Sequence, residues 1–150
     1  MIGKERAEQT GILFFDPARA TGMQERRKRA GHLLSKHRFA AAQMEAYLAD
    51  DLWLRLARHA NATAAVLGQG LAAAGYCPVW PVEANEVFVA LPKAICERLQ
   101  CAGASFYPWT TDSVPADSAS GDSSMLVRLV CSFATEAADV AQFLATIKAG

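Results

Sequence analysis

The sequence predicts an α+β fold in which N-terminal helices precede a small three-stranded, mainly antiparallel sheet with helices on one face. Three observations lead to this prediction. Apolar residues of the first half recur every three to four positions, as in helices. After Gly75, residues 83–91 and 125–133 alternate with a period of two, as in strands. Helical segments separate the first two strands and end the chain.

The composition agrees with a globular chain. Its 150 residues include 15 Lys and Arg against 15 Asp and Glu, and 52% are hydrophobic. This apolar content excludes a wholly disordered chain, and a net charge of zero argues against a general polyanion-binding protein. No apolar run approaches the roughly 20 residues of a membrane span, and the first residues lack the apolar core of a signal peptide. We therefore expect a cytoplasmic protein with no membrane partner.

Residues 1–50 are predicted to form a strand remnant and connecting helices. The apolar run 12–15 fits a strand. Pro17 suits a first helical turn, and the aspartate before it can cap that turn. A break is expected near Gly22, and a second helix is expected over residues 39–49.

A long helix opens the second predicted segment, a small C-terminal α+β domain over residues 51–150. Asp50 or Asp51 is expected to cap this helix, and Gly75 is expected to end it. His59 is predicted to lie on its buried face as a hydrogen-bonded core histidine. That face follows three- and four-residue steps and comprises Leu52, Leu56, His59, Thr63, Val66, Gly70 and Ala73.

The predicted sheet contains strands at residues 83–91, 104–109 and 125–133. Arg128 lies in the middle of the third strand. The first strand places Val87, Val89 and Leu91 on one face and Phe88 and Ala90 on the other. The third places Leu126, Arg128, Val130 and Ser132 opposite Val127, Leu129, Cys131 and Phe133.

Helices and a loop connect the strands. We expect a helix over residues 93–102 that ends at Gly103, and a Ser-, Asp-, Pro- and Gly-rich loop over residues 110–124. Thr135 is predicted to cap a last helix. The apolar stripe of that helix is Val140, Phe143, Leu144 and Ile147.

The cysteines and histidines show no metal-binding pattern. Cys96 and Cys101 lie five residues apart, and no Cys-x-x-Cys occurs among the four cysteines. His32, His37 and His59 lack metal-ligand spacing with acidic residues. We expect buried, reduced thiols and no metal site.

Two sets of cationic residues are candidate binding groups. Arg128 is predicted in mid-strand, where an unpaired charge is costly, and a guanidinium suits bidentate contact with a carboxylate. The alternative is an arginine on the solvated face of an edge strand. Residues 1–60 carry 11 basic and 7 acidic side chains. The basic stretch from Arg26 to Arg38 could bind an anion or form a solvated helix face, and its few aromatics disfavour nucleic acid as a partner.

Five segments together resemble the C-terminal part of the low-specificity L-threonine aldolases, which belong to the β-eliminating lyase group. The resemblance is colinear and covers about residues 11 to 148. It is carried by Phe-Phe-Asp-Pro at 14–17, the basic stretch 26–39, Leu-Trp-Leu-Arg-Leu-Ala-Arg-His-Ala-Asn at 52–61, Pro-Val-Glu-Ala-Asn-Glu-Val-Phe at 81–88 and Val-Arg-Leu-Val-Cys-Ser-Phe at 127–133.

The resemblance implies the aspartate-aminotransferase fold, pyridoxal phosphate as cofactor, and cleavage of threonine or allo-threonine to glycine and acetaldehyde. Arg128 matches the arginine that holds the amino-acid carboxylate. Arg38 matches an arginine that approaches the cofactor phosphate across the subunit interface, and Lys28 or Arg29 serves the same anionic region. The implied partners are threonine and either a second copy of the chain or a missing large domain.

The resemblance also implies that this chain, as a truncated product or remnant, is not catalytic alone. The family's cofactor lysine and the groups around the pyridine ring would lie before residue 1, and Lys4 has unlike neighbours. A Schiff base needs a positioned, activated lysine. We therefore expect no catalytic residue and no covalently bound pyridoxal phosphate in this chain alone. The alternative is a stand-alone interaction or oligomerisation module, because loss of the large domain would expose apolar surface.

Overall fold

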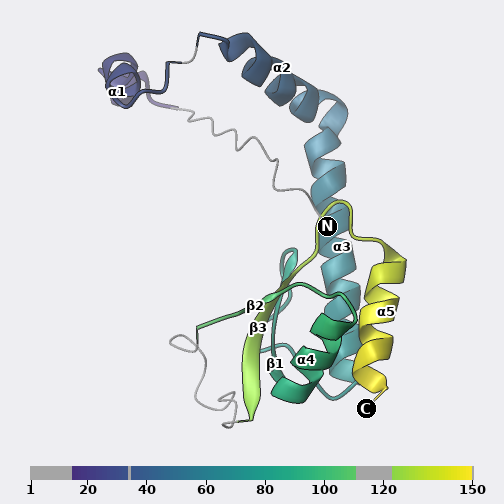
Figure 1. The fold of residues 1–150 in the computed structure, drawn as a ribbon. Coiled ribbons are helices and arrows are strands. Elements are labelled where there is room, and N and C mark those ends of the chain that lie inside the picture. The colour runs from purple at the N-terminus through teal and green to yellow at the C-terminus, as the bar shows by residue number, and fades with distance from the viewer. Residues whose placement is uncertain (1–14, 34, 111–122, 150) are drawn as a thin grey trace. The chain divides into compact units, whose positions relative to one another are not determined.

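The computed structural model describes residues 15–33, 35–110 and 123–149. The chain divides into two compact units, with the boundary after Leu52 (Figure 1). Residues 12–14 of the strand predicted at 12–15 and most of the loop predicted at 110–124 lie outside the described residues, and Phe15 is described as exposed and not in a strand.

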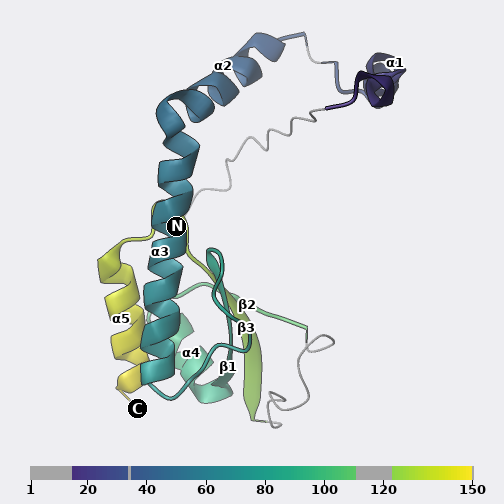
Figure 2. The same cartoon turned by 180° about the vertical axis from the view of Figure 1, so that it is seen from behind.

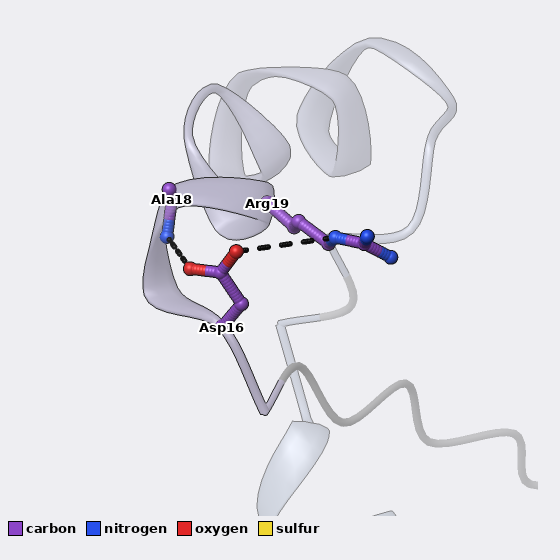
Figure 3. Close-up of polar contacts among 3 residues, drawn as sticks. All are labelled: Asp16, Ala18 and Arg19. Atoms are coloured by element: carbon purple, nitrogen blue, oxygen red, sulfur yellow. Dashed lines mark hydrogen bonds and ion pairs between the residues drawn. The ribbon is translucent and has the colours of Figure 1, made fainter.

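The first unit consists of short helical segments: η1 (Pro17–Ala20), α1 (Met23–Arg29), α2 (His37–Leu48) and η2 (Ala49–Asp51). Asp16 caps η1 as predicted, because its Oδ1 accepts a hydrogen bond from the Ala18 N–H at 3.0 Å (Figure 3). The predicted break is also confirmed, since Gly22 has a φ of 74° between η1 and α1. None of the described residues of this unit is buried.

The second unit packs helices on one side of an antiparallel sheet (Figures 1 and 2). Its strands lie in the order β1-β3-β2. This arrangement confirms the predicted α+β fold. The elements are α3 (Leu52–Ala73), β1 (Glu86–Pro92), α4 (Lys93–Cys101), β2 (Tyr107–Pro108), β3 (Ser124–Val130) and α5 (Ala137–Lys148).

The sheet register places Phe88 of β1 opposite Arg128 of β3. The predicted alternation is confirmed for six residues that are buried on the helix-covered face: Val87, Val89, Leu91, Val127, Leu129 and Cys131. The third strand is shorter than predicted, because β3 ends at Val130 and Phe133, predicted on the same face, is 50% exposed. The second strand is shorter than predicted, because only Tyr107 and Pro108 pair with β3. One further hydrogen bond lies beyond this pairing, because the Trp109 N–H donates to the Leu126 carbonyl at 2.9 Å.

Helix α3 buries a different face from the predicted one. Val66 is 56% exposed and His59 is exposed, so the predicted core histidine is wrong. The His59 Nε2 instead lies 2.9 Å from the Thr135 carbonyl oxygen at the surface. The buried residues of α3 are Ala60, Ala64, Leu67, Gly68 and Leu71. An alanine-rich helix carries apolar residues on more than one face, so periodicity alone does not select the face that meets the sheet.

Two glycines end helices as predicted. Gly75 follows α3 with a φ of 89°, and Gly103 follows α4 with a φ of 96°. After each glycine the next N–H donates back to the last turn of the helix, from Tyr76 to the Leu71 carbonyl and from Ala104 to the Leu99 carbonyl. This is the Schellman arrangement, for which glycine is suited because it adopts a positive φ without strain.

The predicted cap of the last helix is wrong by one residue. Glu136 is the N-cap of α5, and its N–H donates to Asp139 Oδ2 at 2.8 Å as half of a capping box. The hydroxyl of Thr135 is used elsewhere, because it accepts the Ser132 N–H at 2.8 Å. The predicted apolar stripe is confirmed, since Val140 and Ile147 are buried and the two residues between them on the stripe pack against the core. No described helix is long and apolar enough to cross a membrane.

Candidate functional site

An arginine and a group of aromatic side chains lie on the sheet face opposite the helices. Arg128 is paired with Phe88 on one side and Tyr107 on the other. Because side chains alternate along a strand, Arg128 points away from the face on which its neighbours Val127 and Leu129 are buried. We define the Arg128 face as Trp80, Glu86, Phe88, Tyr107, Trp109 and Arg128.

Two contacts orient the Arg128 guanidinium. Its Nη1 lies 3.5 Å from Glu86 Oε1, and the two side chains are 35% and 38% exposed. Its Cζ lies 4.6 Å from the ring centroid of Trp109. A partly exposed ion pair contributes under about 1 kcal/mol, and an exposed cation–π contact contributes about 0.5–1 kcal/mol. The guanidinium is therefore oriented by contacts weak enough for an incoming carboxylate to rearrange.

Three aromatic side chains, Trp80, Phe88 and Trp109, form a cluster beside the guanidinium. Phe88 contacts Trp80 edge-on with centroids 5.1 Å apart, and it contacts Trp109 in the same manner at 5.4 Å. Edge-to-face contacts between rings add about 0.5–1.5 kcal/mol to the burial of their surface. This aromatic cluster therefore restrains the Trp109 ring, against which the Arg128 guanidinium lies.

A reciprocal contact fixes the strand register near Arg128. The Cys131 N–H donates to the Asn85 carbonyl at 2.9 Å, and the Asn85 side-chain amide donates to the Cys131 carbonyl at 2.8 Å. These bonds lie just beyond the paired residues of β1 and β3. They oppose a register slip, which would turn Arg128 toward the core face.

The three cationic residues predicted to bind the cofactor phosphate lie in the first unit. Lys28 and Arg29 are exposed in the last turn of α1. Arg38 is exposed at the start of α2, and its guanidinium carbon lies 5.1 Å from the centroid of the Phe39 ring. These three residues are described within their own unit, and their relation to Arg128 stays a prediction.

The described lysines of the second unit lie away from Arg128. Lys93 begins α4 and Lys148 ends α5, and both helices cover the other side of the sheet. Within the described ranges, no cluster of three His, Cys, Asp or Glu side chains is arranged to hold a metal ion.

The cysteines are only partly as predicted. All four are free thiols, but Cys77 and Cys101 are exposed while Cys96 and Cys131 are buried. Cys131 lines an apolar hollow of about 140 Å³ on the helix side of the sheet. Burial raises the pKa of the Cys131 thiol, so this thiol is a poor source of thiolate and an unsuitable nucleophile.

Sequence reasoning found Arg128 but missed its neighbours. A period of two places Glu86 and Phe88 on one face of β1, which is a signal that the sequence does contain. Their contact with Arg128 depends on the register between β1 and β3, and the approach of Trp109 depends on the path of β2.

Comparison with known proteins relates this fold to one group of enzymes. No protein-family model matches the chain. The chain is 44% identical over 97 residues to the low specificity L-threonine aldolase of Pseudomonas aeruginosa, a match that covers 64% of this chain and 28% of the relative. It is 37% identical over 139 residues to the low specificity L-threonine aldolase of Pseudomonas sp. strain NCIMB 10558, covering 92% of this chain and 37% of the relative.

A solved structure supports the same relationship. The Leishmania major threonine aldolase matches with a TM-score of 0.74 and 26% identity, over 85% of this chain and 35% of that chain. This chain therefore spans about a third of the length of these relatives, and the matches cover between 64% and 92% of its own length.

Proposed function

We propose that this chain corresponds to the small C-terminal domain of a threonine aldolase-type lyase, together with the helices that lead into that domain. Residues 51–150 are the domain in this proposal, and residues 1–50 are the leading segment. The similarity to threonine aldolases over 92% of the chain supports the assignment. The observation that carries the function is the partly exposed guanidinium of Arg128, which points away from the core in the middle of the sheet.

In this proposal Arg128 binds the carboxylate of an amino-acid substrate such as threonine. Its fork of N–H donors matches the two oxygens of a carboxylate, which fixes the direction of the bonds at the α-carbon. The ring of Trp109 lies against the guanidinium and limits its rotation. The Asn85–Cys131 contact keeps β3 in the register that presents Arg128.

In this proposal the chain contributes part of a pyridoxal phosphate site. Threonine aldolases depend on this cofactor, which when bound supplies an electron sink for bond cleavage at the α-carbon. The exposed cations Arg38, Lys28 and Arg29 suit a phosphate. The described part of the second unit offers no lysine beside Arg128. We therefore infer that the attachment lysine comes from a large domain or a second chain, and that this chain is not catalytic alone.

A chimera tests this function. The matching segment of the Pseudomonas aeruginosa relative is replaced by this chain, and threonine cleavage is measured. We expect an active chimera, and we expect Arg128→Gln to lower its kcat/KM by about 100-fold or more, because a charged contact to the substrate is lost. Arg58→Gln is the matched control, since Arg58 is an exposed arginine of α3. A chimera that folds and binds cofactor but is inactive, or one whose activity survives Arg128→Gln, contradicts the proposal.

A second candidate function is a stand-alone interaction or oligomerisation module. The observation that favours it is the exposure of large apolar side chains in the first unit, where Phe39, Tyr47 and Leu48 are about half exposed. Light scattering over a range of protein concentrations tests it. Self-association that is weakened by Phe39→Ser supports a module of this kind, whereas a monomer at every concentration removes the case for self-association.

A further inference from the structure

The Arg128 guanidinium already has a carboxylate beside it from its own chain. Glu86 begins β1 and pairs with Val130, so it lies diagonally across the strands from Arg128 on the same face. Diagonal positions are close enough for two long side chains to meet, and Glu86 Oε1 lies 3.5 Å from Arg128 Nη1. The guanidinium that would bind a substrate carboxylate therefore already contacts Glu86.

The ion pair between Arg128 and Glu86 is long and partly exposed to solvent. Its 3.5 Å separation exceeds the roughly 2.7–2.9 Å of a strong charge-assisted hydrogen bond. Both side chains are more than a third exposed, at 35% and 38%, so water weakens their attraction. A ligand can thus displace this contact, while the pairing of β1 with β3 keeps the Glu86 charge on the same face as Arg128.

That retained charge distinguishes between two kinds of ligand. A plain carboxylate at Arg128 places two negative groups around one cation, and their repulsion weakens binding. An α-amino acid carries an ammonium group beside its carboxylate, so Glu86 gains a new positive partner when it gives up Arg128. The pair of Arg128 and Glu86 is therefore complementary to a zwitterion.

We propose that Glu86 is a selectivity residue of the Arg128 site, and that it favours amino acids over carboxylates without an amino group. This inference rests on the proposed function, in which Arg128 binds the substrate carboxylate. Glu86 acts by occupying the guanidinium in the absence of ligand and by contacting the ammonium group in its presence.

The test compares L-threonine with 3-hydroxybutyrate, which has the same carbon skeleton without the amino group. Binding to the purified full chain is followed by heteronuclear NMR, with the indole N–H of Trp109 as reporter because its ring lies against Arg128. The resonance is assigned with Trp109→Phe. We expect threonine to bind the unmodified chain more tightly, and we expect Glu86→Gln to reduce the threonine preference by about fivefold or more.

Control variants separate this inference from the proposed function. Glu83→Gln, at an exposed glutamate just before β1, should leave the preference unchanged. Arg128→Gln should abolish binding of both ligands, and if it does not, the proposed function itself fails. The role of Glu86 is refuted if Arg128→Gln abolishes binding but Glu86→Gln leaves the threonine preference unchanged. It is also refuted if Glu86→Gln increases the affinity for both ligands equally. Absence of binding by either ligand to a folded chain also overturns it.

Discussion

Leu71→Ala should lower the unfolding free energy of the second unit by about 3 kcal/mol. Leu71 is fully buried in the core that α3 forms with the sheet. Removing its three outer carbons loses about 0.8 kcal/mol for each in transfer free energy, which is about 2.4 kcal/mol. The cavity that is left behind raises the cost into the range of about 2–5 kcal/mol observed for such substitutions.

Val66→Ala is the matched control because Val66 lies on the same helix but is 56% exposed. We expect it to change the unfolding free energy by less than about 0.5 kcal/mol. Urea denaturation of the full chain, followed by far-ultraviolet circular dichroism, measures both variants, with equal slopes required for the comparison. If Val66→Ala costs as much as Leu71→Ala, then α3 buries the face that periodicity suggested and the packing described above is refuted.

Three further predictions concern two side-chain contacts of the second unit and its two buried thiols. Asn85→Ala should cost about 1–2 kcal/mol, because the Cys131 carbonyl loses its side-chain donor; an unchanged urea midpoint would count against this contact. Arg98→Ala should lower the unfolding free energy by about 1–2 kcal/mol and increase hydrogen exchange at the end of α5, since Arg98 donates to two carbonyls there. The exchange rate of Arg98→Lys should lie between those of the unmodified chain and Arg98→Ala. Equal exchange in all three chains would contradict this role of Arg98. Burial raises the pKa of the Cys96 and Cys131 thiols, so the unfolded chain releases these protons at lower pH than the folded chain does. The unfolding free energy should therefore fall as pH rises through the ordinary thiol range, and a flat profile there would contradict the burial of these thiols.

Most local elements could be predicted because their signals lie within a few residues. A glycine placed after a helical segment marks the helix end at Gly75 and Gly103, since a positive φ is needed there. The alternation of residues 86–92 marks a half-buried strand wherever that strand pairs. The predicted cap of α5 is wrong because threonine is a favoured N-cap residue and glutamate is not. In the structure the Thr135 hydroxyl accepts the Ser132 N–H, and Glu136 is the N-cap.

The candidate site was predicted only in part. A charged residue in mid-strand made Arg128 a candidate from the sequence, and resemblance to a known family added a role. The local pattern could not identify Glu86 or Trp109 as its neighbours. These contacts join separate strands, and their existence depends on the register of β1 and β3 and on the short pairing of β2.

By itself, the sequence determined the element types, most helix ends, the alternation of the strands and the presence of a candidate carboxylate-binding arginine. Only the tertiary structure decided which face of α3 is buried, because Val66 and Leu71 are both apolar and the sheet can accept one face at a time. It also decided that Arg128 lies beside Glu86 and Trp109. Local propensity acts through neighbouring residues along the chain, whereas packing selects among apolar faces by shape and burial across the whole unit.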